Sequence, residues 1–323
     1  MINHHFIFVG GLHRSGTTLL HRTIATHPLV SAFHDTGVPE DEGQFLQKVY
    51  PEDASLGGPG VFGLHPTAHM TEQSPAVAKG KAALFKSWMP YWDLTKPYLL
   101  EKTPGNLIRS RFLQEIFPDS TYVFIIRHPV ACVLATFRFQ KNATVSRMFD
   151  NWIRCNGLML QDMAFLRKKL IVRYEDLCEQ TENVIGAIGD VTGLGGRIAV
   201  SPVKREINSH YFAKWRWGDY GLSAGKGRWL APLQRWRNLV CTPYLARKYE
   251  REVNRFGYSF DKLEGSINYN ETSCHGQLHG EIVPHHPKLA WEPPLSKRSP
   301  QVGAAGLESA IGTQTDRRTG TIS

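Results

Sequence analysis

The sequence is poor in cysteine, and its cysteines follow no recognisable pattern. Only five occur among 323 residues, widely spaced and without a Cys-x-x-Cys pair. An odd number of scattered cysteines argues against a disulfide framework and favours free thiols in a reducing compartment.

Long apolar runs are also absent. No stretch approaches the roughly 18 consecutive apolar residues of a membrane-spanning helix, and the first residues, MINHHFIFVGGLHRSG, lack the apolar segment of a signal peptide. We therefore expect a cytoplasmic protein without a membrane span. With 41% hydrophobic residues, the chain can bury a core, which excludes a wholly disordered protein.

Acidic residues are outnumbered by basic ones, 29 to 38, which gives a formal net charge of +9. A basic surface favours an anionic partner such as a nucleotide. The basic residues are dispersed and match no nucleic-acid-binding motif, so we expect no nucleic-acid partner.

Apolar residues are sparse in 263–323, where proline, glycine, serine and threonine dominate. This composition is typical of a disordered, low-complexity tail. Its histidines lack the cysteine pair or carboxylates that usually complete a metal site. We expect one folded domain over 1–262, followed by this tail, and no metal.

The remaining chain alternates between strand-like and helix-like segments. The runs HFIFVG, YLLEKTP, STYVFIIRHP and LIVRYEDL predict strands. This alternation predicts an α/β fold with a parallel sheet and helices on both faces, in which ligands bind at the carboxyl ends of the strands. Helices are expected in GTTLLHRTIATHP, EDEGQFLQKVY, PAVAKGKAALFKSWMPYW, NLIRSRFLQEIFP and VACVLATFRFQ, at 144–168 and 179–190, and in PYLARKYEREVNRFGYSFD, which closes with a short strand.

Residues 195–236 follow neither pattern and are rich in glycine, tryptophan and basic residues. They predict an irregular segment over the site. Core packing of the tryptophans is an equal alternative.

A glycine-rich stretch, GGLHRSGTT, follows the first strand and opens the first helix. Its spacing is that of a phosphate-binding loop, whose backbone N–H groups at a helix N-terminus attract phosphate. In nucleoside triphosphatases this loop carries a lysine, and the next hydroxyl holds magnesium. Here Thr17 replaces the lysine, and Arg14 lies inside the loop. The loop therefore predicts a nucleotide that needs neither a γ-phosphate clamp nor a metal; a turn without a ligand is the alternative.

Four motifs together resemble the sulfotransferase family that uses 3′-phosphoadenosine 5′-phosphosulfate (PAPS), and are most similar to the branch of tyrosylprotein sulfotransferases and many bacterial enzymes. HRSGTTLL resembles the family's 5′-phosphosulfate loop, and YVFIIRHPVACVLATF resembles its 3′-phosphate segment. EKTP resembles its lysine motif, and RYEDL its tyrosine-bearing strand near the adenine. The resemblance covers about residues 5–262. It implies a P-loop NTPase-like three-layer α/β fold, with a central parallel sheet and helices on both faces.

The resemblance also implies which residues hold the donor. The 5′ end would be held by Arg14, Ser15, Gly16, Thr17 and Thr18. Arginine suits this role because its guanidinium forms forked hydrogen bonds to phosphate oxygens.

The 3′-phosphate would be held by Arg127. Family members carry a serine eight residues later, where this chain has Ala135, so the neighbouring Thr136 is the candidate for that contact. Tyr174 would lie near the adenine. A salt bridge at the sheet edge is the alternative role for Arg127.

Sulfuryl transfer needs a cation at the leaving phosphate oxygen and a base for the acceptor hydroxyl. The resemblance assigns Lys102 as the cation and Glu42 as the base. A solvated surface lysine is the alternative for the first, and a charge pair at a helix start is the alternative for the second. Other candidate bases are Glu40, Asp41, His34, Asp35 and His65.

A competing interpretation is a P-loop small-molecule kinase that uses ATP and magnesium, against which Thr17 argues. The acceptor is left open: a small molecule, a carbohydrate or a peptide would each fit. Nothing in the sequence indicates the oligomeric state.

Overall fold

The computed structural model describes residues 3–140, 142–196, 198–199, 207–220 and 231–263. The tail predicted at 263–323 lies outside these ranges except for its first residue, and so does Trp229 in the glycine-rich segment. The domain boundary after residue 262 therefore stays a prediction.

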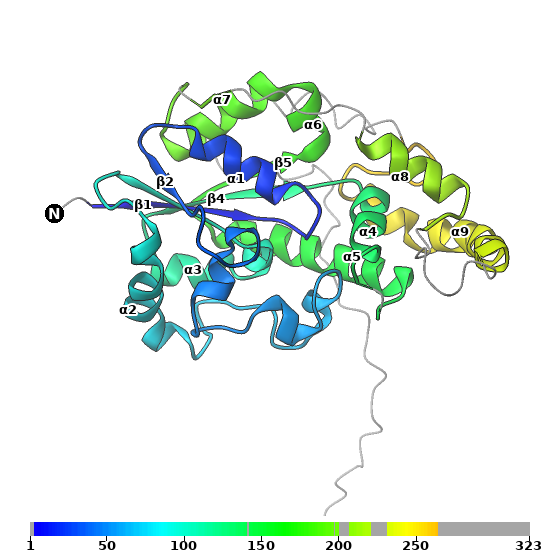
Figure 1. Cartoon of the computed structure of the whole chain (residues 1–323), viewed down its shortest axis with the longest axis horizontal. Helices are drawn as coiled ribbons and strands as arrows, with labels where there is room; N and C mark the ends of the chain where they lie inside the picture. The colour runs from blue at the N-terminus through cyan, green and yellow to red at the C-terminus, as the bar shows by residue number, and fades with distance from the viewer. Residues whose placement is uncertain (1–2, 141, 197, 200–206, 221–230, 264–323) are drawn as a thin grey trace, which may run out of the picture. The chain divides into compact units, whose positions relative to one another are not determined.

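Among the described residues, parallel strands form one sheet in the order β2–β3–β1–β4–β5 (Figure 1). The central position of β1 places the glycine-rich loop in the middle of the carboxyl edge. The strand β2 was not predicted, because three residues are too few to show a periodicity. The strands are β1 His5–Gly10, β2 Val30–Ala32, β3 Tyr98–Lys102, β4 Ser120–Ile126 and β5 Lys168–Arg173.

Helices cover both faces of the sheet (Figure 1). One layer contains α1, α6 and α7, and the other contains α2, α3, α4 and α5. This three-layer architecture, with the glycine-rich loop between β1 and α1, is the predicted P-loop NTPase-like fold, which is confirmed. The helices are α1 Thr17–Ala25, α2 Val77–Trp88, α3 Ser110–Ile116, α4 Pro129–Phe137, α5 Val145–Asp162, α6 Tyr174–Glu179, α7 Thr181–Thr192, α8 Ile207–Arg216 and α9 Ala231–Asn254.

Alternate residues of the central strands feed two separate apolar cores. Phe8 and Phe124 face the core that contains Trp88 and Phe149, whereas Val9 faces the core beneath α1. Because both faces are covered, the strands read as continuous apolar runs rather than as alternating ones. These two cores fix the strands whose carboxyl ends carry the candidate site.

Four sequence predictions of secondary structure were wrong. The segment 40–50 is not an α-helix but contains short 3-10 turns, and 174–177 begins a helix instead of ending a strand. The segment 195–236 contains the helix α8 and the start of α9, and no strand follows α9 in the described chain. Trp215 is buried, as expected for core packing, whereas Trp217 is 62% exposed.

Candidate active site

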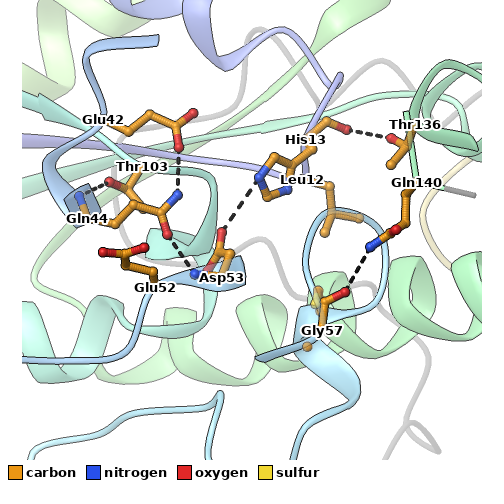
Figure 2. Close-up of polar contacts among 12 residues, drawn as sticks. Leu12, His13, Glu42, Gln44, Glu52, Asp53, Gly57, Thr103, Thr136 and Gln140 are labelled. Carbon is orange, nitrogen blue, oxygen red and sulfur yellow. Dashed lines mark hydrogen bonds and ion pairs between the residues drawn. The ribbon is translucent and has the colours of Figure 1, made fainter. Parts of the chain in front are cut away.

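The carboxyl edge of the sheet brings the four sequence motifs together. The glycine-rich loop leaves β1, Lys102 ends β3, Arg127 follows β4 and Tyr174 follows β5. All four segments emerge at one edge because the strands are parallel. Figure 2 shows polar contacts among residues at this edge.

The glycine-rich loop adopts a backbone that its glycines permit. Gly16 has a φ of +107°, and a Cβ at this position would lie 2.6 Å from Cδ2 of Tyr174. Arg14 also has a left-handed φ, +68°. Turns that include left-handed residues ahead of a helix N-terminus form concave anion-binding sites lined by backbone N–H groups. The loop therefore has the conformation that phosphate binding requires.

The side chains of the loop differ in their burial and in their hydrogen bonds. The Ser15 hydroxyl is buried and donates to the Leu12 carbonyl oxygen at 2.6 Å, which closes the loop. Thr18 donates to the Glu40 carboxylate at 3.2 Å. Thr17 is the buried first residue of α1. Arg14 is exposed, so the loop cation faces solvent.

Arg127 is held behind the loop by three contacts. Its Nη1 donates to the Arg14 carbonyl oxygen and its Nε to Oδ1 of Asn208, both at 2.8 Å. Its guanidinium carbon lies 4.3 Å from the ring centroid of Tyr174. The remaining nitrogen, Nη2, is buried without a hydrogen-bond partner among the described residues. Leaving such a donor unpaired costs about 1–3 kcal/mol, so Arg127 is suited to an anionic oxygen.

Thr136 and Tyr174 both lie against the loop. The Thr136 hydroxyl donates to the Cys132 carbonyl oxygen at 2.8 Å and lies 3.3 Å from that of His13. It would have to exchange one of these contacts to donate to a phosphate. Burial raises the pKa of Tyr174 to about 12, so its phenol stays neutral and offers an aromatic face beside Gly16.

Lys102 and Glu42 form a buried ion pair. Lys102 Nζ lies 3.1 Å from Glu42 Oε1 and donates to the Glu40 carbonyl oxygen at 2.7 Å. Lys102 is fully buried and Glu42 is 6% exposed, so the surface-lysine alternative is wrong. Removing one partner of such a pair leaves an uncompensated buried charge, which typically costs about 3–5 kcal/mol.

The backbone around Glu42 explains why no helix forms there. Glu42 is extended between the 3-10 turns Pro39–Asp41 and Gly43–Leu46. Glu40 and Asp41 have left-handed φ values of +53° and +51°. The helix-start alternative for the acidic residues is therefore wrong, because the first turn of an α-helix is missing.

The residues beside Lys102 hold the Glu42 segment in place, a role that no sequence pattern predicts. Glu101 Oε1 accepts from the Gly43 N–H at 3.0 Å, and Thr103 Oγ1 accepts from the Gln44 N–H at 3.1 Å. Glu101 also accepts from the Thr103 hydroxyl and from the amide of Asn106, each at 2.6 Å. Burial raises the pKa of Glu101 to about 7, although these hydrogen bonds favour its ionised form.

Three other candidate bases are His34, Asp35 and His65. His34 and Asp35 form a pair of exposed side chains 3.5 Å apart, and His65 contacts the hydroxyl of Thr67. Among the described residues, no hydrogen bond or ion pair joins them to Lys102. In the same residues, no group of three or more histidine, cysteine or carboxylate side chains could hold a metal ion.

No helix within the described ranges combines the length and the apolar character that a membrane span requires.

Known structures give weak matches to this chain. The sulfotransferase domain of the Synechococcus PCC 7002 olefin synthase is 18% identical, with 76% of this chain and 96% of that one covered and a TM-score of 0.41. The sulfotransferase domain of the curacin biosynthetic pathway is 18% identical, with 80% and 99% covered and a TM-score of 0.41. A Mycobacterium tuberculosis H37Rv sulfotransferase is 17% identical, with 73% and 76% covered and the same TM-score.

Comparison with curated proteins finds no match. A family model matches residues 7–195, more than half of the chain, and is described as "Sulfotransferase family". The matched range includes the glycine-rich loop, Lys102, Arg127 and Tyr174. The chain belongs to the sulfotransferase family.

Proposed function

We propose that the protein transfers the sulfuryl group of PAPS to a hydroxyl or amine of an acceptor by metal-independent in-line displacement. The observation that carries this proposal is the buried Lys102–Glu42 pair at the carboxyl edge of the sheet, beside the glycine-rich loop. When bound, the donor supplies a sulfuryl group on a phosphate leaving group.

In this proposal, three groups of residues hold the donor. The unpaired Nη2 of Arg127 supports its assignment to the 3′-phosphate, with Thr136 beside the same loop. Tyr174, whose ring packs on the Arg127 guanidinium, is assigned to the adenine side. The 5′ end is assigned to Arg14, Ser15, Gly16, Thr17 and Thr18.

The chemistry requires two groups of opposite charge. Glu42 takes the proton of the acceptor while the new S–O bond forms and the bond from sulfur to the leaving phosphate oxygen breaks. Lys102 stabilises the negative charge that develops on that oxygen. A positioned base typically contributes about 10² to 10⁴-fold in rate, and a cation at the leaving oxygen lowers the barrier further because it acts in a dry site.

Two wider expectations belong to the same proposal. We propose that the folded domain ends near residue 262. We also propose that the enzyme works in the cytoplasm, which is supported by the unpaired state of Cys132, Cys155, Cys178 and Cys241.

A screen of acceptor libraries with isotopically labelled PAPS tests the proposal. Small molecules, carbohydrates and peptides are incubated with the protein and chelator, and mass spectrometry detects the labelled product. Transfer of the label to at least one class of acceptor is expected. Phosphorylation of an acceptor from ATP and magnesium, with no transfer from PAPS, would contradict the proposal and favour the kinase interpretation.

A further inference from the structure

Gln44 makes a direct hydrogen bond to the proposed base. Its Nε2 donates to Glu42 Oε2 at 2.6 Å, and its Oε1 accepts from the Asp53 N–H at 2.8 Å (Figure 2). Its own backbone N–H donates to Thr103 Oγ1 at 3.1 Å. Gln44 is 1% exposed, so its side chain is fixed at both ends of the amide.

The partner of Gln44 is anchored in turn by a buried arginine and lies near the glycine-rich loop. Asp53 Oδ1 accepts from Arg109 Nη2 at 2.8 Å, and its Oδ2 lies 3.7 Å from His13 Nε2. Both Asp53 and Arg109 are buried. His13 lies in the loop, and Figure 2 shows its ring directed toward Asp53. Hydrogen bonds therefore connect Glu42 through Gln44 to the backbone of Asp53, whose carboxylate lies near His13 but beyond hydrogen-bond distance of it.

The two oxygens of Glu42 have different partners. Oε1 faces Lys102 and Oε2 faces Gln44. In the proposed reaction Lys102 must turn its charge to the leaving oxygen, and Gln44 is then the side chain that still holds the Glu42 carboxylate. Its hydrogen bond to an ionised acceptor is of the stronger, charge-assisted type.

We propose that Gln44 is a positioning residue, which holds the Glu42 carboxylate in place and aims it at the acceptor. The inference rests on the proposed function. It assigns Gln44 no contact with the donor or the acceptor.

A second buried glutamine provides a matched control. Gln47 is 6% exposed and its Nε2 donates to the carbonyl oxygens of Gln44 and Tyr50 at 3.0 and 2.9 Å. Within the described chain, its side-chain hydrogen bonds involve backbone atoms of the same segment and not the Glu42 carboxylate. The two glutamines are therefore both buried in the same short segment but differ in their contact with the proposed base.

The experiment is a double-mutant cycle. Gln44→Met, Gln47→Met and Glu42→Gln are made alone, and Gln44→Met is combined with Glu42→Gln. Turnover is followed as transfer of label from PAPS to the acceptor found in the screen, and to water as inorganic sulfate. Binding of 3′-phosphoadenosine 5′-phosphate is measured on each variant as a test of the folded donor site.

Gln44→Met is expected to lower kcat by about tenfold to a hundredfold, with bisphosphate affinity within about threefold of wild type. In the Glu42→Gln background it should change kcat by less than about twofold, because the carboxylate that it positions is already gone. Gln47→Met should leave most of kcat. If Gln44→Met does not fold, Gln44→Asn, which keeps the amide but cannot span both partners, should show the same dependence on Glu42.

Equal losses of kcat from Gln44→Met in both backgrounds would overturn the inference while leaving the proposed function intact. An equal effect of Gln47→Met would overturn it too, since it would indicate damage to the segment as a whole. If Glu42→Gln keeps kcat within about threefold, the base assignment fails and the role of Gln44 fails with it. Absence of label transfer by the wild-type protein would overturn the proposed function itself.

Discussion

Arg127→Ala should remove much of the protein's ability to distinguish nucleotides with a 3′-phosphate from those without one. The guanidinium has two kinds of contact. Nη1 and Nε hold the Arg14 carbonyl and Asn208, so their loss disturbs the loop and affects every nucleotide that binds there. Nη2 has no partner in the described chain, and its proposed contact exists only when a 3′-phosphate is present.

The expected magnitude follows from this division. A hydrogen bond to a charged group contributes about 1.5–3 kcal/mol, which corresponds to a loss of about tenfold to 150-fold in affinity. This loss should apply to 3′-phosphoadenosine 5′-phosphate and not to adenosine 5′-phosphate. The structural part of the loss should be common to both ligands.

Isothermal titration calorimetry of the two nucleotides on wild type and variant measures the difference. Asn208→Ala is the control, since it removes the partner of Nε and keeps the guanidinium. It should weaken both ligands by similar, smaller factors. If Arg127→Ala weakens both ligands equally, Arg127 does not contact the 3′-phosphate, and the assignment is refuted.

Lys102→Met should lower kcat by at least about 10²-fold while bisphosphate binding persists, and full turnover of this variant would refute the role. Lys96→Met, which likewise removes a lysine that donates to a backbone carbonyl oxygen, should keep kcat. Gly16→Ala should destabilise the fold by about 1–3 kcal/mol in thermal unfolding and weaken nucleotide binding, because Gly16 has a φ of +107°. Gly157 has open space around it, so Gly157→Ala should be neutral or stabilising by up to about 1 kcal/mol in the same assay. Burial lowers the pKa of His128 from 6.5 to about 4, so between these pH values the unfolded chain takes up a proton that the folded protein does not. The free energy of unfolding should therefore decrease as pH falls from about 6.5 to about 4, and urea titrations of His128→Asn should show a shallower decrease.

The sheet and the loop could be predicted from sequence because their signals are local. The strand β4 is a continuous buried apolar run, and the loop carries its glycines at fixed spacing before a helix. The strand β2 and the first turn of α6 could not be assigned in this way. Tyr174 follows a β-branched run and looks like its continuation, and only the packing of its ring against Gly16 and Arg127 shows where the helix begins.

The base candidates show the limit of local patterns more clearly. Glu40, Asp41 and Glu42 are adjacent acidic residues, and no periodicity distinguishes them. Glu42 differs from its two neighbours in that its carboxylate contacts Lys102, 60 positions away in the chain. The hydrogen bond between Gln44 and Asp53 also depends on turns that include left-handed residues. Local helix propensity favours a different backbone there, so the sequence alone does not predict these turns.

Thermal unfolding of the wild-type protein tests most directly whether the site is built for the phosphosulfate donor. One sample contains 3′-phosphoadenosine 5′-phosphate and EDTA, and the other contains ATP and magnesium without EDTA. At a hundredfold excess over its dissociation constant, the bisphosphate should stabilise the folded protein by about 2.7 kcal/mol without metal. ATP with magnesium should stabilise it less at the same concentration. Stabilisation by ATP and magnesium, with none by the bisphosphate, would contradict the proposed function.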